Sequence, residues 1–341
     1  MRTILALFVA VTLSGLPSIS DAENTTRWSQ FKARFIDPGG RVIDTQNNEM
    51  SHSEGQAYAL LLAVHFNDPA TFARVRSWTQ RHLALRDDGL LMWSWDAESQ
   101  SVSDRNAASD AELIYAWAHW LGARRFQNPA YRGFAVRHFA RIREALIVRR
   151  GGGTYLLPGP TGFTRDDRLT LNPSYWVFGA IDAAARADSM PGIWEALATT
   201  GEKLLADARF GAGQLPADWV TTKGDGVYRP ARDFDPHYGF EAIRIPLYLI
   251  GSGRSDHAAI ASIAMHHRQH PGVIVWNVES DTAVLSGAHA GVASIAALAI
   301  CAVDNQRPSR TLDLSSDYYP ASLQLLVERA IQHSGDKPCD Q

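Results

Sequence analysis

The sequence is poor in cysteine and contains no recognisable cluster of metal ligands. Only Cys301 and Cys339 occur among its 341 residues, and two cysteines do not make the disulfide scaffold that holds many small exported domains together. A buried free thiol and a disulfide to Cys339 both fit the apolar helical stretch around Cys301. The twelve histidines include no HExxH motif and do not pair with the cysteines, so we expect neither a metal nor another cofactor. We interpret the run "HHRQH" at 266–270 as the solvated end of a helix.

Charge of one sign is not in excess either. The formal net charge is −3 and charged residues make up 20% of the chain, which gives no electrostatic reason to expect nucleic acid or an anionic membrane as a partner. The sequence has no G-x-G-x-x-G motif and no regular alternation of strands and helices, which argues against a doubly wound nucleotide-binding fold. It also lacks a fixed-period repeat and a linker-like stretch, so residues 23–341 are predicted to form a single domain.

Long apolar runs are confined to the N-terminus. Arg2 is followed by "ILALFVAVTL" and then by a stretch with small residues that ends at Ala22. This pattern predicts a secretory signal peptide over residues 1–22, and therefore a periplasmic or secreted protein with no membrane segment after cleavage. The alternative is an uncleaved membrane anchor, which the pattern favours less because the run is short for a bilayer.

The hydrophobic residues, 45% of the chain, recur mainly at helical spacing. Asp68 followed by Pro69, and Asn172 followed by Pro173, have the form of an N-cap with proline in the first turn. Short loops rich in glycine, proline and aromatics separate the helices and contain a few strand candidates. The fold class is therefore all-α, a helical barrel or bundle. Helices are expected at 27–36, 54–66, 67–83, 110–121, 129–148, 172–187, 191–208, 238–251, 257–267, 287–303 and 320–332.

Acidic residues stand near several of these helix starts, where ordinary capping explains them. The stretch "SEGQAYALLLAV" at 53–64 follows Ser51, and Ser51 with Glu54 fits the S-x-x-E capping box, in which the glutamate reaches back to a free backbone amide. Ser109 and Glu112 fit the same pattern. Asp110, between them, suits a helix N-terminus through the helix dipole.

A third acidic position, Glu241, has Arg244 one turn later, and a surface ion pair between them would explain both. These separate explanations weaken when the acids are considered together, because each lies beside aromatic residues. Ten tryptophans is also a high number for this length. The neighbouring aromatics are Tyr58, then Tyr115 and Trp117, then Tyr238 and Phe240.

Acids beside aromatic rings are typical of sites that bind sugars. Aromatic planes stack on the C–H faces of sugar rings, and carboxylates hydrogen-bond sugar hydroxyls. Hydrolysis of a glycosidic bond needs two carboxyl groups, one protonated donor and one that activates water or attacks carbon. A glutamate beside an aromatic wall and other acids has its pKa pushed upward, which suits the donor.

Four stretches in a fixed order then resemble a known family. They are "SEGQAYALLLAV" at 53–64, "ASDAELIYAWA" at 108–118, "YGFEAIRIPLYL" at 238–249 and "DYYPASLQLL" at 317–326, and "GLLMWSW" and "NPSYW" also fit. The chain resembles glycoside hydrolase family 8 from about residue 26 to residue 333. Within that family it is most similar to the periplasmic endoglucanases that accompany bacterial cellulose synthesis, so the cellulose-synthesis machinery is an expected partner.

The resemblance implies an (α/α)6 barrel with an open cleft across one end and hydrolysis with inversion, without a cofactor. It implies that Glu54 is the general acid, that Asp110 binds the sugar ring at the point of cleavage, and that Glu241 is the base. The substrate-binding residues expected with them are Tyr58, Trp93, Trp95, Tyr175, Trp176, Arg244 and Tyr318.

The sequence departs from the family pattern at two positions. Glu112 replaces the second aspartate of "ASDAD", and Glu241 replaces the aspartate of "Y-D-A-x-R". The distance range of inverting sites is wide enough to keep Glu241 as the base. Asp233 and Asp235 are the rival candidates for that role.

These observations together predict an endo-acting β-1,4-glucanase. Two alternatives stay open. The same fold could hydrolyse another β-glycan, such as xylan, chitosan or an exopolysaccharide. The departure at Glu241 also leaves room for a glycan-binding protein with impaired catalysis.

Overall fold

The structure is a computed structural model that describes residues 19–304, 313 and 316–333. Most of the predicted signal peptide and Cys339 lie outside these residues. Cys301 is disulfide-bonded. No helix within the described ranges is long and apolar enough to cross a membrane.

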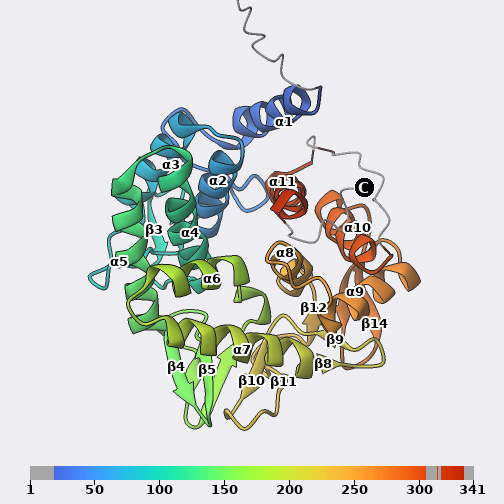
Figure 1. Cartoon of the computed structure of the whole chain (residues 1–341). Helices are drawn as coiled ribbons and strands as arrows, with labels where there is room; N and C mark the ends of the chain where they lie inside the picture. Colours follow the sequence, from blue (N-terminus) through green and yellow to red (C-terminus); the bar gives the residue numbers. More distant parts are fainter. Residues whose placement is uncertain (1–18, 305–312, 314–315, 334–341) are drawn as a thin grey trace, which may run out of the picture.

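Eleven α-helices make up most of the described chain (Figure 1). They are α1 (Ile19–Phe35), α2 (Ser53–His65), α3 (Pro69–His82), α4 (Ser109–Arg125), α5 (Pro129–Leu146), α6 (Phe178–Ala187), α7 (Pro191–Asp207), α8 (Ile245–Ile250), α9 (Ala258–Gln269), α10 (Ala290–Asp304) and α11 (Tyr318–His333). Two 3-10 turns, η1 (Pro173–Tyr175) and η2 (Ala242–Arg244), precede α6 and α8.

The helices form a closed double ring. Helices α2, α4, α6, α8 and α11 contact one another in that order, and α11 returns to α2. Each of α3, α5, α7 and α9 packs outside the inner helix before it, and α10 packs against α8, α9 and α11. This double ring is the helical barrel that the sequence predicts, and the contacts assign five helices to its inner ring.

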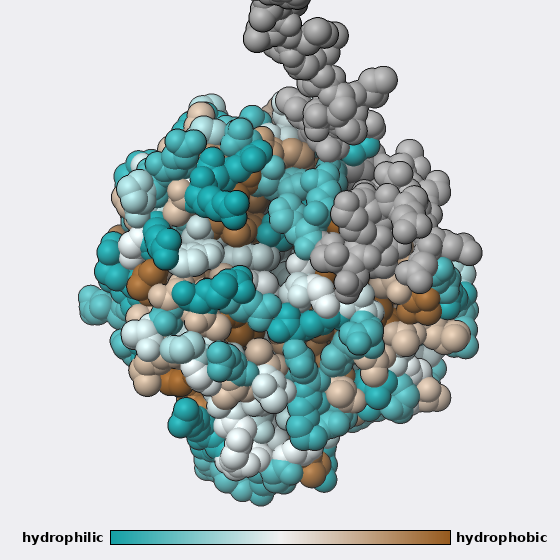
Figure 2. Space-filling model, viewed as in Figure 1, coloured by the Kyte–Doolittle hydropathy of each residue, from teal (hydrophilic) through white to brown (hydrophobic). Residues whose placement is uncertain are grey.

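Burial follows from the sequence of each helix. Inner helix α2 is buried at every position from Ser53 to Val64 except Glu54, as expected for a helix that is apolar on all sides. Outer helix α5 buries only one stripe, which includes Ala135, Phe139 and Ile142. The outer surface is accordingly polar, and Figure 2 shows a mainly hydrophilic face with small, separate hydrophobic patches.

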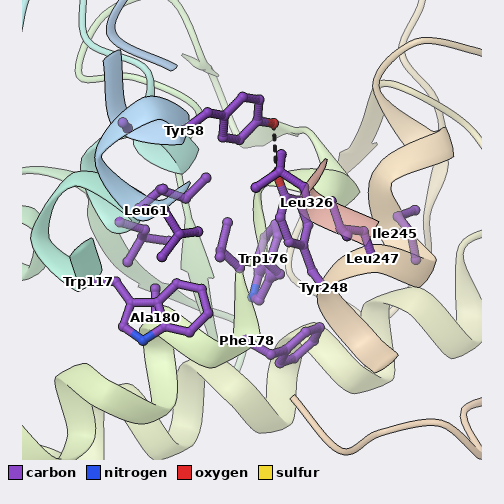
Figure 3. Packing of buried hydrophobic residues seen from close by; sticks show 14 of the residues in the cluster. Tyr58, Leu61, Trp117, Trp176, Phe178, Ala180, Ile245, Leu247, Tyr248 and Leu326 are labelled. Atoms are coloured by element: carbon purple, nitrogen blue, oxygen red, sulfur yellow. Dashed lines mark hydrogen bonds between the residues drawn. The ribbon is translucent and has the colours of Figure 1, made fainter. Parts of the chain in front are cut away.

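Side chains from opposite inner helices meet inside the ring (Figure 3). Tyr58 of α2 and Tyr248 of α8 approach with their hydroxyl oxygens 3.0 Å apart. Trp117, Trp176 and Phe178 lie below them in the same core (Figure 3). This interior is filled, so a substrate has to bind at an end of the barrel.

The predicted capping by Asp68 is confirmed. Its carboxylate accepts a hydrogen bond from the Thr71 amide at 2.9 Å, with Pro69 in the first turn of α3. It also accepts from Trp28 and Lys32 of α1. The cap therefore attaches the first helix to the barrel.

Two expected helices are shorter than predicted. Asn172 caps only η1, because the Trp176 side chain turns into the core and donates to the Leu197 carbonyl at 3.2 Å, so α6 begins at Phe178. The region 238–251 begins with a strand and η2, because a side chain outside this segment, Asp218, binds the amides of Gly239 and Ala242. Helical periodicity in the sequence does not reveal either constraint.

Short antiparallel strands connect the helices. They form sheets in the orders β1-β2-β3, β11-β10-β7-β6 and β12-β13-β14, and the hairpins β4-β5 and β8-β9. β1 leads directly into α2, and β12 comes shortly before η2. The strands are β1 (Ser51–His52), β2 (Ser94–Asp96), β3 (Ser101–Asp104), β4 (Ile147–Arg150), β5 (Gly153–Leu156), β6 (Thr164–Arg165), β7 (Arg168–Leu171), β8 (Arg209–Phe210), β9 (Leu215–Pro216), β10 (Val220–Thr222), β11 (Arg229–Pro230), β12 (His237–Tyr238), β13 (Val273–Asn277) and β14 (Thr282–Ser286).

The histidine run at 266–270 is not the solvated helix end that the sequence predicts. His266 and His267 are buried. The Nε2 atom of His267 lies 3.0 Å from the Tyr238 hydroxyl, and His266 packs edge-on to Trp276. Within the described residues no group of three or more His, Cys, Asp or Glu could hold a metal ion.

Candidate active site

A buried arginine lies between the acidic residues singled out in the sequence. Arg244, at the end of η2, is 1% exposed. Its Nη1 atom donates to Glu54 and, at 3.3 Å, to Asp110, and its Nη2 atom donates to Glu241. Tyr58 and Ser174 lie within hydrogen-bond distance of the same guanidinium. The pair between Glu241 and Arg244 therefore exists, but it is part of a buried network and not a surface ion pair.

Glu54 is presented by the first turn of α2 and does not cap that helix. The N-cap is His52, whose Nδ1 atom accepts from the Gly55 amide at 3.0 Å. Ser51 donates to the Val42 carbonyl instead of forming the predicted box. The Glu54 side chain is consequently free to point out of the helix, where it is 18% exposed.

Asp110 occupies the corresponding place at the start of α4. It is fully buried, and its Oδ1 atom accepts from the Ala111 amide at 2.8 Å. The N-cap residue of α4 is Ala108, without a side-chain cap, so the second predicted capping box is also wrong.

Glu112 is occupied elsewhere. Its carboxylate accepts from the Leu91 amide at 2.6 Å and lies 2.6 Å from the Nε2 atom of His138 on α5. Both Glu112 and His138 are buried. The departure from the family pattern at this position therefore lies in a structural link between α4, α5 and the loop before β2, and not at the acidic cluster.

Glu241 is held where the chain enters η2. Its Oε2 atom accepts from Asn172 at 3.2 Å in addition to Arg244. Its neighbours are held by Asp218, whose Oδ1 atom accepts from the amides of Gly239 at 2.9 Å and Ala242 at 2.8 Å. The backbone on both sides of Glu241 is thus fixed from the strand side of the barrel.

Burial and mutual charge set the ionisation of the cluster. Burial raises the pKa of Glu54, but the charge of Arg244 and the hydrogen bonds from Asp110 and Arg244 outweigh it, so this pKa lies below its usual value and not above it as the sequence predicts. Burial and the negative charge of Glu54 raise the pKa of Asp110 well above its usual value. Burial raises the pKa of Glu241 more than Arg244 lowers it. These opposite shifts favour the proton of the pair on Asp110, which is hydrogen-bonded to Glu54.

Asp218 has a strongly perturbed pKa as well. Burial raises it to about 7, and the charge of Glu241 adds to this shift, although the two backbone amides act against it. Carboxyl groups with strongly shifted pKa values are common at functional sites. Asp218 combines such a shift with hydrogen bonds from two backbone amides and a neighbouring carboxylate.

The network forms the floor of an open cavity of about 550 Å³. Glu54, Asp110, Glu241 and Arg244 line it together with aromatic side chains. The aromatic residues that line it are Trp93, Tyr175, Phe240 and Tyr319. A floor of carboxyl groups under aromatic walls can bind a sugar ring and exchange protons with it.

The structure therefore brings together Glu54, Asp110 and Glu241 with Arg244, as the resemblance implies, and it places Trp93 and Tyr175 at the cavity. Four other predicted binding residues do not line it.

Tyr58, Trp95, Trp176 and Tyr318 are buried, each at most 8% exposed. Trp95 packs edge-on to Trp78, and Tyr58 reaches only the Arg244 and Tyr248 groups beneath the cavity. Their burial contradicts the expectation that they stack on sugar.

Tyr318 is displaced from the cavity by one position of the helix. It packs against Phe35 and His52, while the next residue, Tyr319, lines the cavity and donates to the Phe240 carbonyl at 2.6 Å. Tyr318 also explains Gly55, because a Cβ atom there would lie 2.8 Å from the Tyr318 hydroxyl oxygen.

The rival bases lie apart from the cluster. Asp233 and Asp235 are exposed and do not line the cavity, and the Asp233 side chain is 78% exposed near Arg165.

Sequence analysis did not assign five residues to the site: His52, Asn172, Asp218, Phe240 and Tyr319. Phe240 and Tyr319 adjoin residues that were chosen, and sequence gives no means of telling which neighbour faces outward. Asp218 stands in "PADW", an acid beside an aromatic, but it lies between β9 and β10 and not at a helix start, which is where the other acids were found.

Comparisons with known proteins identify the family of the chain. The model of glycosyl hydrolases family 8 matches residues 1–333. The chain is 36% identical over 250 residues to an endoglucanase of Cellulomonas uda, which is 73% of this chain and 68% of that protein. It is 31% identical over 308 residues to a probable endoglucanase of Novacetimonas hansenii, covering 88% of this chain and 89% of that protein.

Solved structures show the same likeness. The chain matches the family 8 endoglucanase Cel10 of Klebsiella pneumoniae with a TM-score of 0.84 and 33% identity, over 90% of this chain and 99% of that one. The endo-β-1,4-glucanase CMCax of Acetobacter xylinum matches with a TM-score of 0.84 and 28% identity, over 92% and 99% of the two chains.

Proposed function

Since the chain belongs to glycosyl hydrolases family 8, we propose that it is an endo-acting β-1,4-glucanase that hydrolyses internal bonds with inversion. The observation that carries this proposal is the pair Glu54 and Glu241, which approach the two Nη atoms of one guanidinium at the floor of an aromatic-lined cavity. Two carboxyl groups in one open cavity are what hydrolysis of a glycosidic bond needs.

Glu54 is the proposed proton donor. The proton of the pair is favoured on Asp110, which is hydrogen-bonded to Glu54, and Glu54 is the member of this pair that is exposed to the cavity. As the bond between the anomeric carbon and the glycosidic oxygen breaks, the proton passes from Glu54 to that oxygen. Arg244 then stabilises the carboxylate that remains on Glu54.

Glu241 is the proposed base. Its raised pKa favours uptake of a proton from a water molecule. The resulting oxygen nucleophile attacks the anomeric carbon from the face opposite the leaving group, which inverts the configuration. Asp110 lines the same cavity and is hydrogen-bonded to Glu54, so its proposed role is to hold the sugar ring and a proton for Glu54.

Hydrolysis of soluble cellulose derivatives tests the proposed function. We expect the purified protein to lower the viscosity of carboxymethylcellulose well before most reducing ends appear, which is the behaviour of an endo-acting enzyme. The Glu54→Gln variant should lose activity by about a hundredfold or more while it keeps its melting temperature and its glucan binding. A folded wild-type protein that binds glucan but releases no reducing ends would support the glycan-binding alternative. Faster cleavage of xylan or chitosan would show that another β-glycan is the preferred substrate.

Export is part of the same proposal. The apolar run after Arg2 and the small residues before Glu23 support secretion to the periplasm or the medium, where an extracellular or newly made glucan is accessible. The cellulose-synthesis machinery is the proposed partner. N-terminal sequencing of the protein from a fractionated host should begin at Glu23, and recovery of the intact N-terminus in the membrane fraction would favour the uncleaved anchor.

A further inference from the structure

A second open cavity, of about 540 Å³, lies over the four-stranded sheet β11-β10-β7-β6. Along β7 and β10 the buried residues Leu169, Leu171 and Val220 alternate with more exposed ones. The opposite, outward side is formed by the strand positions Arg165, Arg168, Thr170, Thr221 and Arg229, which all line this cavity. We call these five residues the arginine face. Three aspartates, Asp166, Asp225 and Asp233, also line the cavity, beside five cationic residues: Arg165, Arg168, Lys223, Arg229 and Arg232.

The strand register places like charges side by side on this face. Arg165 of β6 is directly opposite Arg168 of β7, and like charges in such a cross-strand pair destabilise a sheet. In the next row, Arg229 of β11 stands opposite Thr221, which stands opposite Thr170. An anion over the face would relieve the repulsion and would find hydroxyl groups beside the guanidinium groups.

The carboxylates near this face come from turns and leave two cations unpaired. Asp167 lies 2.5 Å from the Lys223 ammonium, and Asp233 lies 4.0 Å from Arg165. Within the described part of the chain, Arg229 and Arg232 have no side-chain hydrogen bond or ion pair, and both are exposed. Their guanidinium groups are available to a ligand.

The arginine face adjoins the active-site cavity through a stack of rings. Tyr175, which lines the active site, packs edge-on to Trp219 at 6.0 Å. Trp219 immediately precedes β10 and is stacked between Phe163 and Phe234. Phe163 and Phe234 adjoin Thr164 of β6 and Asp233 of the second cavity. This stack of rings runs from a residue that lines the active-site cavity to neighbours of residues that line the second cavity.

We propose that the arginine face, with Arg232, binds carboxylate groups on the polysaccharide whose backbone is cleaved, so that the preferred substrate is a β-1,4-glucan with acidic substituents. This rests on the proposed function. Guanidinium groups bind carboxylates through paired hydrogen bonds. The acidic active site would repel such substituents, whereas the arginine face attracts them beyond the point of cleavage.

Binding of two soluble glucans with the same backbone tests the assignment. The probes are carboxymethylcellulose, which is anionic, and hydroxyethylcellulose, which is neutral. Affinity gel electrophoresis in the Glu54→Gln background gives dissociation constants without digestion. The double variant Arg229→Gln and Arg232→Gln is compared with Arg137→Gln, a matched removal of an exposed arginine from α5.

We expect the double variant to bind carboxymethylcellulose about three- to tenfold more weakly and hydroxyethylcellulose equally well. The Arg137→Gln control should change neither constant, and 0.5 M salt should remove the difference between the double variant and its parent. Equal losses on both polymers, or no loss at low salt, would overturn the assignment. Because binding is measured apart from hydrolysis, a protein that binds as expected but cleaves neither polymer would contradict only the proposed function.

Discussion

Glu241 shows how one extra methylene group can be accommodated at the residue scale. Its longer side chain reaches both Arg244 and Asn172, which donate to the same carboxylate oxygen, Oε2. We expect Glu241→Ala to lower kcat about a hundredfold or more, because the proton acceptor is lost. Glu241→Asp should keep part of the activity, because the carboxylate remains. Aspartate is also the residue that the resemblance leads us to expect at this position.

Steady-state rates on a cello-oligosaccharide measure this series. Asp233→Ala and Asp235→Ala are the matched controls and should stay near the wild-type rate, because neither residue lines the cavity. If Asp235→Ala is inactive while Glu241→Ala stays active, Asp235 and not Glu241 would be the base.

Asp218 acts on the reaction through the backbone that carries Glu241. Asp218→Ala removes the acceptor for the amides of Gly239 and Ala242, so we expect kcat to fall about tenfold or more while KM changes little. Asp218→Asn keeps an oxygen acceptor. Since the pKa of Asp218 is about 7, the wild-type group is mainly protonated at pH 5, where the asparagine variant should match it.

The wild type and the Asp218→Asn variant should differ only at higher pH. Above pH 7 the wild-type carboxyl group ionises and the asparagine does not, so the pH–rate profiles should separate there. Identical profiles for the wild type and Asp218→Asn from pH 5 to pH 9 would show that this ionisation does not reach Glu241.

Sequence reasoning at this scale found acids more reliably than aromatics. Glu54, Asp110 and Glu241 stand out because a charged residue at the start of an apolar helix needs a reason. Tyr318 and Tyr319 are adjacent and chemically identical, and only the packing of Tyr318 against Phe35 decides which one faces the cavity. Trp176 was assigned to the cleft for the same lack of information, since sequence does not show which tryptophans are buried.

At the scale of the elements, a hydrogen bond between α3 and α4 depends on a neutral histidine. His119 of α4 is fully buried, its Nδ1 atom lies 2.8 Å from the Tyr115 carbonyl, and Arg76 of α3 donates to its Nε2 atom at 3.1 Å. The Nε2 atom can accept only when the ring is uncharged. Burial is the main reason that the pKa of His119 is lowered to about 3.

This histidine makes stability depend on pH. In the unfolded chain its pKa is near 6.5, so below that pH the unfolded state takes up a proton that the folded state refuses until about pH 3. The contribution is complete above pH 6.5 and is lost as the pH falls, by about 1.4 kcal/mol per pH unit. Between pH 6.5 and pH 5, we expect the wild type to lose about 2 kcal/mol more than His119→Gln.

Urea unfolding at several pH values measures that difference. Glutamine cannot titrate, so the variant retains the pH dependence of every other group and serves as the reference. Parallel stability curves for the two proteins would show that His119 is protonated equally in the folded and unfolded states.

Capping signals were useful at this scale only where proline accompanied them. Asp68 with Pro69 predicted a helix start correctly, because proline is favoured in the first turn of a helix. The two S-x-x-E patterns did not predict capping boxes correctly, because residues of both patterns form tertiary hydrogen bonds instead. Ser51 is bound to Val42, and Glu112 to Leu91 and His138.

At the scale of the whole molecule, the active site depends on closure of the ring. Glu54 comes from α2, Asp110 from α4 and Glu241 from the entry to η2, and the contact of α11 with α2 joins the two ends of the chain. Periodicity predicts the helices but contains no information on which helices meet. The barrel was therefore predicted through the resemblance and not from the pattern of hydrophobic residues.

The stereochemistry of hydrolysis depends on the separation of the two carboxyl groups. Glu54 and Glu241 are separated by the guanidinium group of Arg244. A double displacement needs carboxyl groups only about 5–5.5 Å apart with the nucleophile against the sugar, whereas inversion needs about 6.5–9.5 Å to admit a water molecule. The inversion proposed for Glu54 and Glu241 requires the wider of these two separations. We therefore expect the first product from a cello-oligosaccharide to carry the α configuration at its new reducing end. Proton NMR during the first minutes, before mutarotation mixes the anomers, distinguishes the outcomes, and a first-formed β anomer would exclude inversion and with it the role assigned to Glu241.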